Sequence, residues 1–533
     1  MKKLTFVIGS GPSGVSAVHA LLHAGRRVAL IDAGFRLEPE RQRRIEVMRA
    51  SEKHEWSQAH NGWLKEGMEG GVAGVPLKLT FGSDFPYRAA RKYIPTMLRG
   101  VDTAPSMALG GLSNVWGAAI LPHRDVDIED WPISSVDLES HYAAVSCFMA
   151  TAGTKDRLAS LFPFNNNVCS EPLMLSRQAE GFLADLERNH TTLEANGLYF
   201  GRSRLAVRSR SSDRETGCVY CGLCMYGCPI GAIFNSASAL RSLLQYSNFS
   251  YINDLVVERV EERGEEVVIL AKSIEDGRAV SLTGDRVYLA AGSLSTTRIL
   301  LRSMEAYETP LYMHDSQYFI FPFLRYQGAG NVTKEALHTL SQAFIEIIDP
   351  KISPSTIHLQ VYGYNDILER TAKSMLGPLR NLFKAPLMGM LSRMMIFQGY
   401  LHSRQSNRIR VELRRADNGA EPRLHLDATG AASVKEPINA VLKKLRRLRP
   451  YLRGVPLHAL LRIAKPGRGF HSGGAFPMRS APLGFESDTL GRPVGYNRVH
   501  AVDSTVFPTI PATTITFTAM ANAHRIASAA NEA

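Results

Sequence analysis

The sequence lacks a long apolar run, and this absence excludes a membrane-spanning protein. No stretch of the 533 residues approaches the ~18 consecutive apolar residues that cross a bilayer. The apolar run after the basic start ends at Gly9 after about six residues, which is shorter than the ~7–15 residues of a signal-peptide core. We therefore expect no transmembrane helix and no secretory leader, and we predict a cytoplasmic location.

Cysteine is also scarce, with six residues in the whole chain, too few for a disulfide-stapled scaffold of this length. Internal repeats and low-complexity linkers are absent. The basic residues, 62 Lys and Arg against 50 Asp and Glu, are scattered rather than gathered into one tract. Nucleic acid is therefore not an expected partner, whereas the net charge of +12 is compatible with an acidic partner or peripheral contact with a membrane.

Four of the six cysteines lie together in the stretch CVYCGLCMYGCP. They are Cys218, Cys221, Cys224 and Cys228. This C-x₂-C-x₂-C-x₃-C-P spacing is typical of bacterial iron–sulfur ligation. We predict an iron–sulfur cluster, with [4Fe–4S] favoured and with Cys169 or Cys147 as alternative completing ligands. Zinc is the competing interpretation, although zinc sites usually carry two short cysteine pairs separated by a longer insert.

The first 32 residues predict a dinucleotide-binding unit. An apolar strand over residues 4–8 leads into Gly9, Gly11, Ser13 and Gly14, then into a helix and a second strand that ends at Asp32. In G-x-G-x-x-G the first glycine permits a tight turn, the second lets the backbone approach a pyrophosphate, and the third packs helix against strand. The acid is placed to bind a ribose. This unit alone leaves the choice between FAD and NAD open.

Further segments of the same character are dispersed along the chain. Residues 107–119 hold two adjacent glycines in a small-residue loop, residues 287–301 run from strand through turn to helix, and residues 498–527 form a short strand, a Pro-punctuated loop and a helix. A long ligand lying across a sheet would require such segments.

Together these segments resemble the glucose-methanol-choline (GMC) flavin oxidoreductases. The matching motifs are GSGPSG, GGLSNVWG, AAGSLSTTRILL, HSGGAFPM, AVDSTVFPT and DWPISSVDLESHY. The resemblance implies an α/β plus α+β fold, in which a Rossmann-type FAD-binding domain is built from discontinuous segments and a substrate lobe is built on an antiparallel sheet. It assigns residues 1–125, 200–305 and 465–533 to the FAD-binding domain, and residues 126–199 and 306–464 to the substrate lobe.

The resemblance also implies a set of cofactor-binding residues. Besides the N-terminal glycines, Ser13 and Asp32, they are Gly110, Gly111, Ser113, Asn114, Val256, Ala291, Gly292, Asp503 and Thr514. Some relatives attach FAD through a histidine, but here Val115 stands at that position, so non-covalent FAD is expected.

His471 is the catalytic base that the resemblance implies, because it begins the H-x-x-G segment. A neutral imidazole accepts a proton near pH 7. The family usually has a second His or Asn about forty residues later, but the corresponding position here is Ala512. Thr513 is the candidate to replace it, and this departure weakens the alcohol-oxidation assignment.

The predicted function is an FAD-dependent dehydrogenase that oxidises a hydroxyl of a sugar, polyol, sterol or similar alcohol. Electrons would pass from the flavin to the cysteine cluster and then to a ferredoxin, cytochrome or quinone. A similarity to sugar dehydrogenase subunits also admits a [3Fe–4S] cluster on Cys218, Cys224 and Cys228. The alternatives are a reductase or redox-neutral enzyme that receives electrons through the cluster, and a non-enzymatic electron-transfer subunit.

The middle of the chain bears on the substrate. Strands are expected at TIHLQVYGY and RIRVELRR, and a helical segment is expected over residues 374–401. We interpret this segment as helices that cap the pocket, with a lipid- or partner-facing amphipathic surface as the alternative.

Overall fold

A five-stranded parallel sheet forms the centre of the first half of the molecule. The computed structural model describes residues 4–66, 77–164, 169–213, 215–377, 384–416, 421–430 and 433–529. The strand order is β22-β11-β1-β2-β7, and every pair is parallel. The strands are β1 (Leu4–Ile8), β2 (Arg27–Ile31), β7 (Phe249–Ile252), β11 (Arg286–Leu289) and β22 (Val499–Ala501). Because they come from distant parts of the sequence, this domain is built from discontinuous segments, as predicted.

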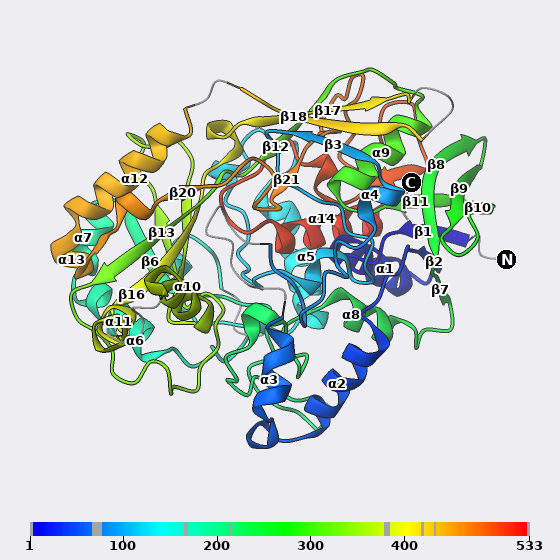
Figure 1. The fold of residues 1–533 in the computed structure, drawn as a ribbon. Coiled ribbons are helices and arrows are strands. Elements are labelled where there is room, and N and C mark those ends of the chain that lie inside the picture. Colours follow the sequence, from blue (N-terminus) through cyan, green and yellow to red (C-terminus); the bar gives the residue numbers. More distant parts are fainter. Residues whose placement is uncertain are drawn as a thin grey trace.

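Helices cover this parallel sheet, so its strands are apolar on both faces. They include α1 (Pro12–His23), α5 (Ser135–Phe148), α8 (Ser236–Leu243), α9 (Ser293–Ser303) and α14 (Ile515–Ala529). Helices α1 and α14 pack side by side beside the sheet (Figure 1). An antiparallel sheet of β8 (Leu255–Arg263), β9 (Glu266–Ser273) and β10 (Ala279–Gly284) contacts β1 and β11 and shares their hydrophobic core.

A larger antiparallel sheet forms the second half. Its order is β19-β13-β16-β15-β14-β6, with β20 also paired to β13. The strands are β6 (Leu198–Arg202), β13 (Tyr318–Arg325), β14 (Ala343–Ile347), β15 (Ile357–Tyr362), β16 (Met394–Tyr400), β19 (Gly454–Pro456) and β20 (Arg462–Ile463). Helices α6 (Arg177–Arg188), α7 (His190–Ala195), α12 (Lys435–Arg447) and α13 (Arg449–Leu452) lie beside it (Figure 1).

The two faces of this large sheet differ in chemistry. Alternate residues such as Phe319, Phe323, Leu359 and Phe397 are fully buried and form a core with the helices. The opposite face carries a row of polar side chains that are paired across neighbouring strands. The row consists of Glu346, His358, Tyr400 and Tyr318. We call these four residues the polar row.

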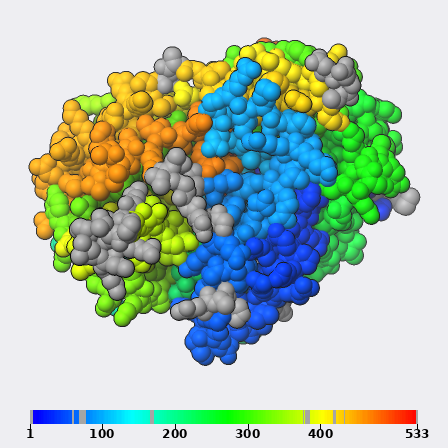
Figure 2. Space-filling model, viewed as in Figure 1, coloured from blue at the N-terminus to red at the C-terminus, as the bar shows by residue number. Residues whose placement is uncertain are grey.

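A third, mixed sheet joins the two halves, in the order β21-β12-β17-β18-β3. Its strands are β3 (Thr96–Arg99), β12 (Leu311–Asp315), β17 (Arg408–Arg414), β18 (Arg423–Thr429) and β21 (Ser472–Gly473). Next to it, the backbone N–H of Asp102 donates to the carbonyl of Pro466 at 2.9 Å. The space-filling view shows these parts of the chain, blue and orange, in contact on one face (Figure 2).

The remaining elements lie around these sheets. They are α2 (Pro39–Ala50), α3 (Gln58–Leu64), α4 (Ala90–Tyr93), α10 (Asp366–Leu376), α11 (Lys384–Leu391), β4 (Thr151–Ala152) and β5 (Cys169–Ser170). Among the described residues, no helix combines the length and the apolar character needed to cross a membrane.

The prediction of a helical segment over residues 374–401 is wrong in its last part. Residues 384–391 are helical, but Met394–Tyr400 is strand β16, and residues 378–383 lie outside the described part of the chain. The strand is favoured because Phe397 enters the core while Tyr400 joins the polar row. A Cβ on Gly399 would come within 2.2 Å of the Phe319 ring, so glycine permits this close strand packing. The predicted fold class is otherwise confirmed.

We predict that Phe397→Ala destabilises the large sheet. The ring is fully buried and lies 4.8 Å from the ring of Phe323, measured between centroids. Its removal should cost about 3–5 kcal/mol and lower the urea midpoint of unfolding. Tyr312→Ala is the control, because Tyr312 is 48% exposed and should change stability by less than about 0.5 kcal/mol. Equal shifts in the two variants would contradict this account of the core.

Candidate active site and cofactor cavity

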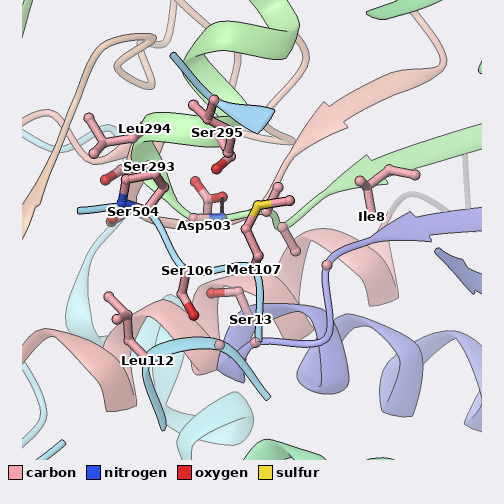
Figure 3. A pocket seen from close by; sticks show the side chains of 18 of the residues that line it. Ile8, Ser13, Ser106, Met107, Leu112, Ser293, Leu294, Ser295, Asp503 and Ser504 are labelled. Carbon is pink, nitrogen blue, oxygen red and sulfur yellow. Dashed lines mark hydrogen bonds between the residues drawn. The ribbon is translucent and has the colours of Figure 1, made fainter. Parts of the chain in front are cut away.

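One cavity of about 230 Å³ lies at the carboxyl ends of the parallel strands. It extends from the turn after β1 to Phe470 and Ser472, which stand on either side of His471 in the sequence. Figure 3 shows that the first strand, the loop Ser106–Leu112, the start of α9 and Asp503 converge there. The predicted cofactor residues in its wall are Gly9, Gly11, Ser13, Asp32, Gly111, Val256, Ala291, Gly292 and Asp503.

The three N-terminal glycines have different physical roles. A Cβ on Gly14 would lie 1.9 Å from the carbonyl oxygen of Gly9, and one on Gly9 would lie 2.5 Å from the carbonyl oxygen of Ala290. These two glycines therefore permit close backbone packing. A Cβ on Gly11 would meet no described atom within 4 Å, so Gly11 opens onto the cavity at the N-terminus of α1. Such a helix terminus attracts phosphate, so this turn fits a dinucleotide pyrophosphate.

Asp32 lies at the end of β2 in the wall of the same cavity. It accepts hydrogen bonds from the hydroxyls of Ser10 and Tyr251. Burial raises the pKa of Asp32 to about 7, against the lowering effect of these hydrogen bonds. Ser10, which the sequence did not single out, also accepts a hydrogen bond from the Gly110 N–H at 2.8 Å. The predicted ribose-binding acid is thus tied to the loop at residues 107–119.

Within that loop, two of the predicted flavin contacts hold the backbone instead of lining the cavity. The Ser113 hydroxyl donates to the Gly110 carbonyl at 2.6 Å. The Asn114 amide donates to the Gly111 carbonyl at 2.7 Å and accepts from Asn235 at 2.7 Å. Gly111 lines the cavity, whereas Gly110 has φ +83° and sits too close to Ala237 for a side chain. These contacts fix the loop shape.

Asp503 organises the opposite wall. Its carboxylate accepts from the Gly292 N–H at 2.9 Å and from the Thr296 hydroxyl at 2.6 Å. Burial raises the pKa of Asp503. Arg298, in the same turn and helix, lines the cavity and is 2% exposed. The sequence motif identified the segment of Arg298 but not Arg298 itself. Its place in α9, a turn and a half beyond Gly292, is the signal that could have identified it.

His471 lies between the cavity and the large sheet. Its ring stacks on that of Tyr400, with centroids 4.8 Å apart and planes 20° apart. Its Nδ1 atom is buried without a hydrogen-bond partner among the described residues, whereas the residue as a whole keeps partial exposure. Burial, followed by the charge of His358, lowers the pKa of His471 to about 4. The imidazole is therefore neutral at pH 7.

The second predicted catalytic residue is arranged differently. Ala512 is fully buried and packs against Tyr318 and Tyr400, so it offers no polar group. Thr513 is also fully buried, and its hydroxyl pairs with Nδ1 of His123 at 3.0 Å. Burial and then the charges of two other histidines lower the pKa of His123 to about 3. The Thr514 hydroxyl accepts from the Leu121 N–H at 2.8 Å, outside the cavity wall.

The four clustered cysteines line a second, small cavity of about 20 Å³. Cys218, Cys221, Cys224 and Cys228 are all free thiols, and Cys147 is free and exposed. The side chain of Cys169 lies outside the described part of the chain. Over the described residues, no group of three or more His, Cys, Asp or Glu side chains is arranged to hold a metal ion. The side-chain positions therefore do not show the predicted iron–sulfur cluster.

Lys78 lies near both the cysteine stretch and the loop at residues 107–119. The ammonium of Lys78 donates to the Trp116 carbonyl at 3.0 Å, and the Trp116 indole donates to the Phe234 carbonyl at 2.9 Å. Burial lowers the pKa of Lys78 to about 8, whereas the thiols Cys224 and Cys228 raise it. This lysine is half-buried and is close to both segments.

Comparisons with known proteins agree with this arrangement. A family model described as GMC oxidoreductase matches residues 107–306. No curated protein matches the chain. Pyridoxine 4-oxidase from Mesorbium loti has a similar structure, with a TM-score of 0.60, 13% identity and 99% of each chain covered. An FAD-dependent oxidoreductase from Chaetomium thermophilum, solved with a bound fragment, gives 0.59, 14% and 99% of each chain. At these identities the two structures show a shared fold only.

The fold and the cavity are those expected of a flavin-dependent oxidoreductase. Residues 107–306 match the GMC oxidoreductase model, and this match supports an enzyme of the class that acts on CH–OH donors. FAD is the cofactor that this family match implies, and the open cradle over Gly11 fits it.

We predict that Gly11→Val abolishes FAD retention without unfolding the chain. The valine side chain would enter the space above Gly11, where no described atom lies within 4 Å. Flavin content, measured by absorbance after denaturation, should fall at least about tenfold, because the pyrophosphate loses its close approach to the backbone. Gly62→Val, also in open space, is the control and should retain flavin. Full flavin content in Gly11→Val would place the cofactor elsewhere.

Proposed function

We propose that the protein is an FAD-dependent dehydrogenase that oxidises a hydroxyl group of a sugar, polyol, sterol or similar alcohol. The observation that carries this proposal is His471, a neutral imidazole whose sequence neighbours Phe470 and Ser472 line the cofactor cavity. We also propose that residues 1–125, 200–305 and 465–533 form the FAD-binding domain, and that residues 126–199 and 306–464 form the substrate lobe.

Alcohol oxidation needs a proton acceptor beside a hydride acceptor. When bound, FAD supplies the hydride acceptor. His471 would take the hydroxyl proton, and its low pKa keeps it unprotonated at neutral pH. The N-terminal glycines, Asp32, Gly111, Gly292 and Asp503 would hold the cofactor without a covalent bond. Thr513 would act through His123, because its hydroxyl is already engaged there.

We further propose that electrons leave through an iron–sulfur cluster on Cys218, Cys221, Cys224 and Cys228. Supporting this, the four thiols line one cavity, and the Ala232 N–H donates to the Cys228 sulfur at 3.3 Å. N–H···S bonds of this kind tune cluster potentials. The connection through Lys78 to the flavin loop is a second support. The external acceptor would be a ferredoxin, a cytochrome or a quinone. Peripheral contact of the protein with a membrane is one way in which it would reach such an acceptor.

One observation favours a second candidate. Ala512 leaves the expected position without a hydrogen-bonding side chain. A reductase, or a redox-neutral enzyme that receives electrons through the cysteines, would not need a side chain at this position to hydrogen-bond to an alcohol substrate. The match of residues 107–306 to the GMC oxidoreductase model favours an enzyme over the non-catalytic alternative.

We predict that His471→Gln lowers kcat/KM by about 10²- to 10⁴-fold, because the proton acceptor is lost. The assay is anaerobic bleaching of the flavin by D-glucose, sorbitol, benzyl alcohol, cholesterol and pyridoxine. In the wild type, protonation of His471 should lower kcat/KM only as the pH falls toward about 4. His458→Gln, at an exposed position, is the control. An acid limb near pH 6.5, or an active His471→Gln, would contradict the proposed base.

We predict about four irons and four sulfides per chain in protein purified without oxygen. Cys224→Ser should remove them and slow reoxidation of the reduced flavin by ferredoxin, while flavin reduction by the alcohol continues. Cys147→Ser is the matched control, since this thiol is free and exposed. Yellow protein without iron would leave the alcohol oxidation intact and refute the electron exit.

A further inference from the structure

Two histidines whose rings lie beside Tyr400 have buried ring nitrogens without a hydrogen-bond partner among the described residues. They are Nε2 of His358 and Nδ1 of His471, neither of which has a hydrogen bond to any described residue. Buried polar atoms in folded proteins are nearly always hydrogen-bonded, either to protein or to ordered water. Two such nitrogens beside one tyrosine therefore indicate a hydrogen-bonding group that contacts both of them.

The first histidine is held by an acid. Nδ1 of His358 lies 2.6 Å from Oε1 of Glu346, and both side chains are completely buried. The contact is fixed by the sheet, because Glu346 on β14 and His358 on β15 stand directly opposite each other. With Nδ1–H donated to the carboxylate, Nε2 of His358 is left as a hydrogen-bond acceptor.

Tyr400 brings the two histidines together. It stands opposite His358 in the next strand, and their ring centroids are 6.2 Å apart. The ring of His471 also stacks on that of Tyr400, with centroids 4.8 Å apart. The proposed base His471 thus lies against the polar row of the large sheet.

We infer that Glu346 and His358 are positioning residues for His471, joined to it by an ordered water between His358 Nε2 and His471 Nδ1. In this arrangement Nδ1–H of His471 donates to the water, and the water donates to His358. This fixes the tautomer in which Nε2 of His471 carries a free lone pair. The inference rests on the proposed function, because it explains how His471 is held in the tautomer that can accept the substrate proton.

The arrangement also accounts for the charge that develops in the reaction. When Nε2 accepts the hydroxyl proton, His471 becomes a cation in a buried setting, which costs free energy. The Glu346 carboxylate, acting through His358 and the water, would stabilise that cation, as the third member of a catalytic triad does. No proton needs to leave His471 along this route, so the substrate loses one proton to Nε2 and one hydride to the cofactor.

Variants of the pair provide the kinetic test, in holoenzyme with flavin content and Tm measured. His358→Leu should lower kcat by about 100-fold and change KM less than about threefold, because tautomer and charge matter most in the transition state. His358→Gln, whose amide oxygen can accept from the water, should recover kcat to within about tenfold of the wild type. Glu346→Gln, which keeps the shape and removes the charge, should lower kcat by about tenfold or more, and it serves if His358→Leu does not fold.

His500→Leu is the matched control. His500 is also completely buried, has Nδ1 bonded to the Leu490 carbonyl at 2.9 Å, and has Nε2 without a described partner, but it lies on β22 against Tyr288. It should keep the wild-type kcat. Wild-type kcat in both His358→Leu and Glu346→Gln, or an equal loss in His500→Leu, would overturn the inference while leaving the proposed function standing.

A crystal structure of the oxidised holoenzyme tests the link without turnover. We expect one water within hydrogen-bond distance of both His358 Nε2 and His471 Nδ1, and its loss in His358→Leu. Density that joins either nitrogen to a different partner would overturn the inference even in an active enzyme. If none of the five alcohols bleaches the wild-type flavin, the proposed function fails by a separate result, and the water bridge alone then decides whether the pair positions His471.

Discussion

The close contact between the Gly9 turn and the first turn of α1 sets the geometry on which the rest of the cofactor cavity depends. At 1.9 Å from the Gly9 carbonyl, a Cβ on residue 14 has no room, and a Cβ on Gly9 would meet Ala290. Backbones that approach this closely can do so only without side chains. The N-terminus of α1 and the turn after β11 consequently reach the same edge of the sheet, where Asp32 and Asp503 stand on opposite sides.

Much of this arrangement could be predicted from the sequence because its signals are local. The strand, the glycines, the helix and Asp32 occupy 32 consecutive residues, and each has a fixed task in the turn. Strand β16 could not be predicted in the same way. Its residues, rich in methionine, suit a helix when they are considered alone, and only the partner strands β13 and β15 decide otherwise.

The same distinction applies to the site. Gly11, Asp32 and Asp503 line the cavity as expected, whereas Ser113 and Asn114 bind backbone and Asn235, a residue far away in the sequence. Glu346 and His358 were missed because only strand register brings them together and points them toward Tyr400. The cysteine spacing was evident, but spacing does not fix where four sulfur atoms lie once the loop is folded.

Along each strand of the large antiparallel sheet, alternate residues face the hydrophobic core and the polar face. Odd-numbered positions of β15, such as Leu359 and Val361, belong to the core, while His358, Gln360 and Tyr362 belong to the other face. Substitutions at every second residue could therefore change the chemistry of one face while the packed core on the other face is left intact. The same alternation prevents the strand register from shifting by one residue, because such a shift would bury the Glu346 carboxylate among phenylalanines.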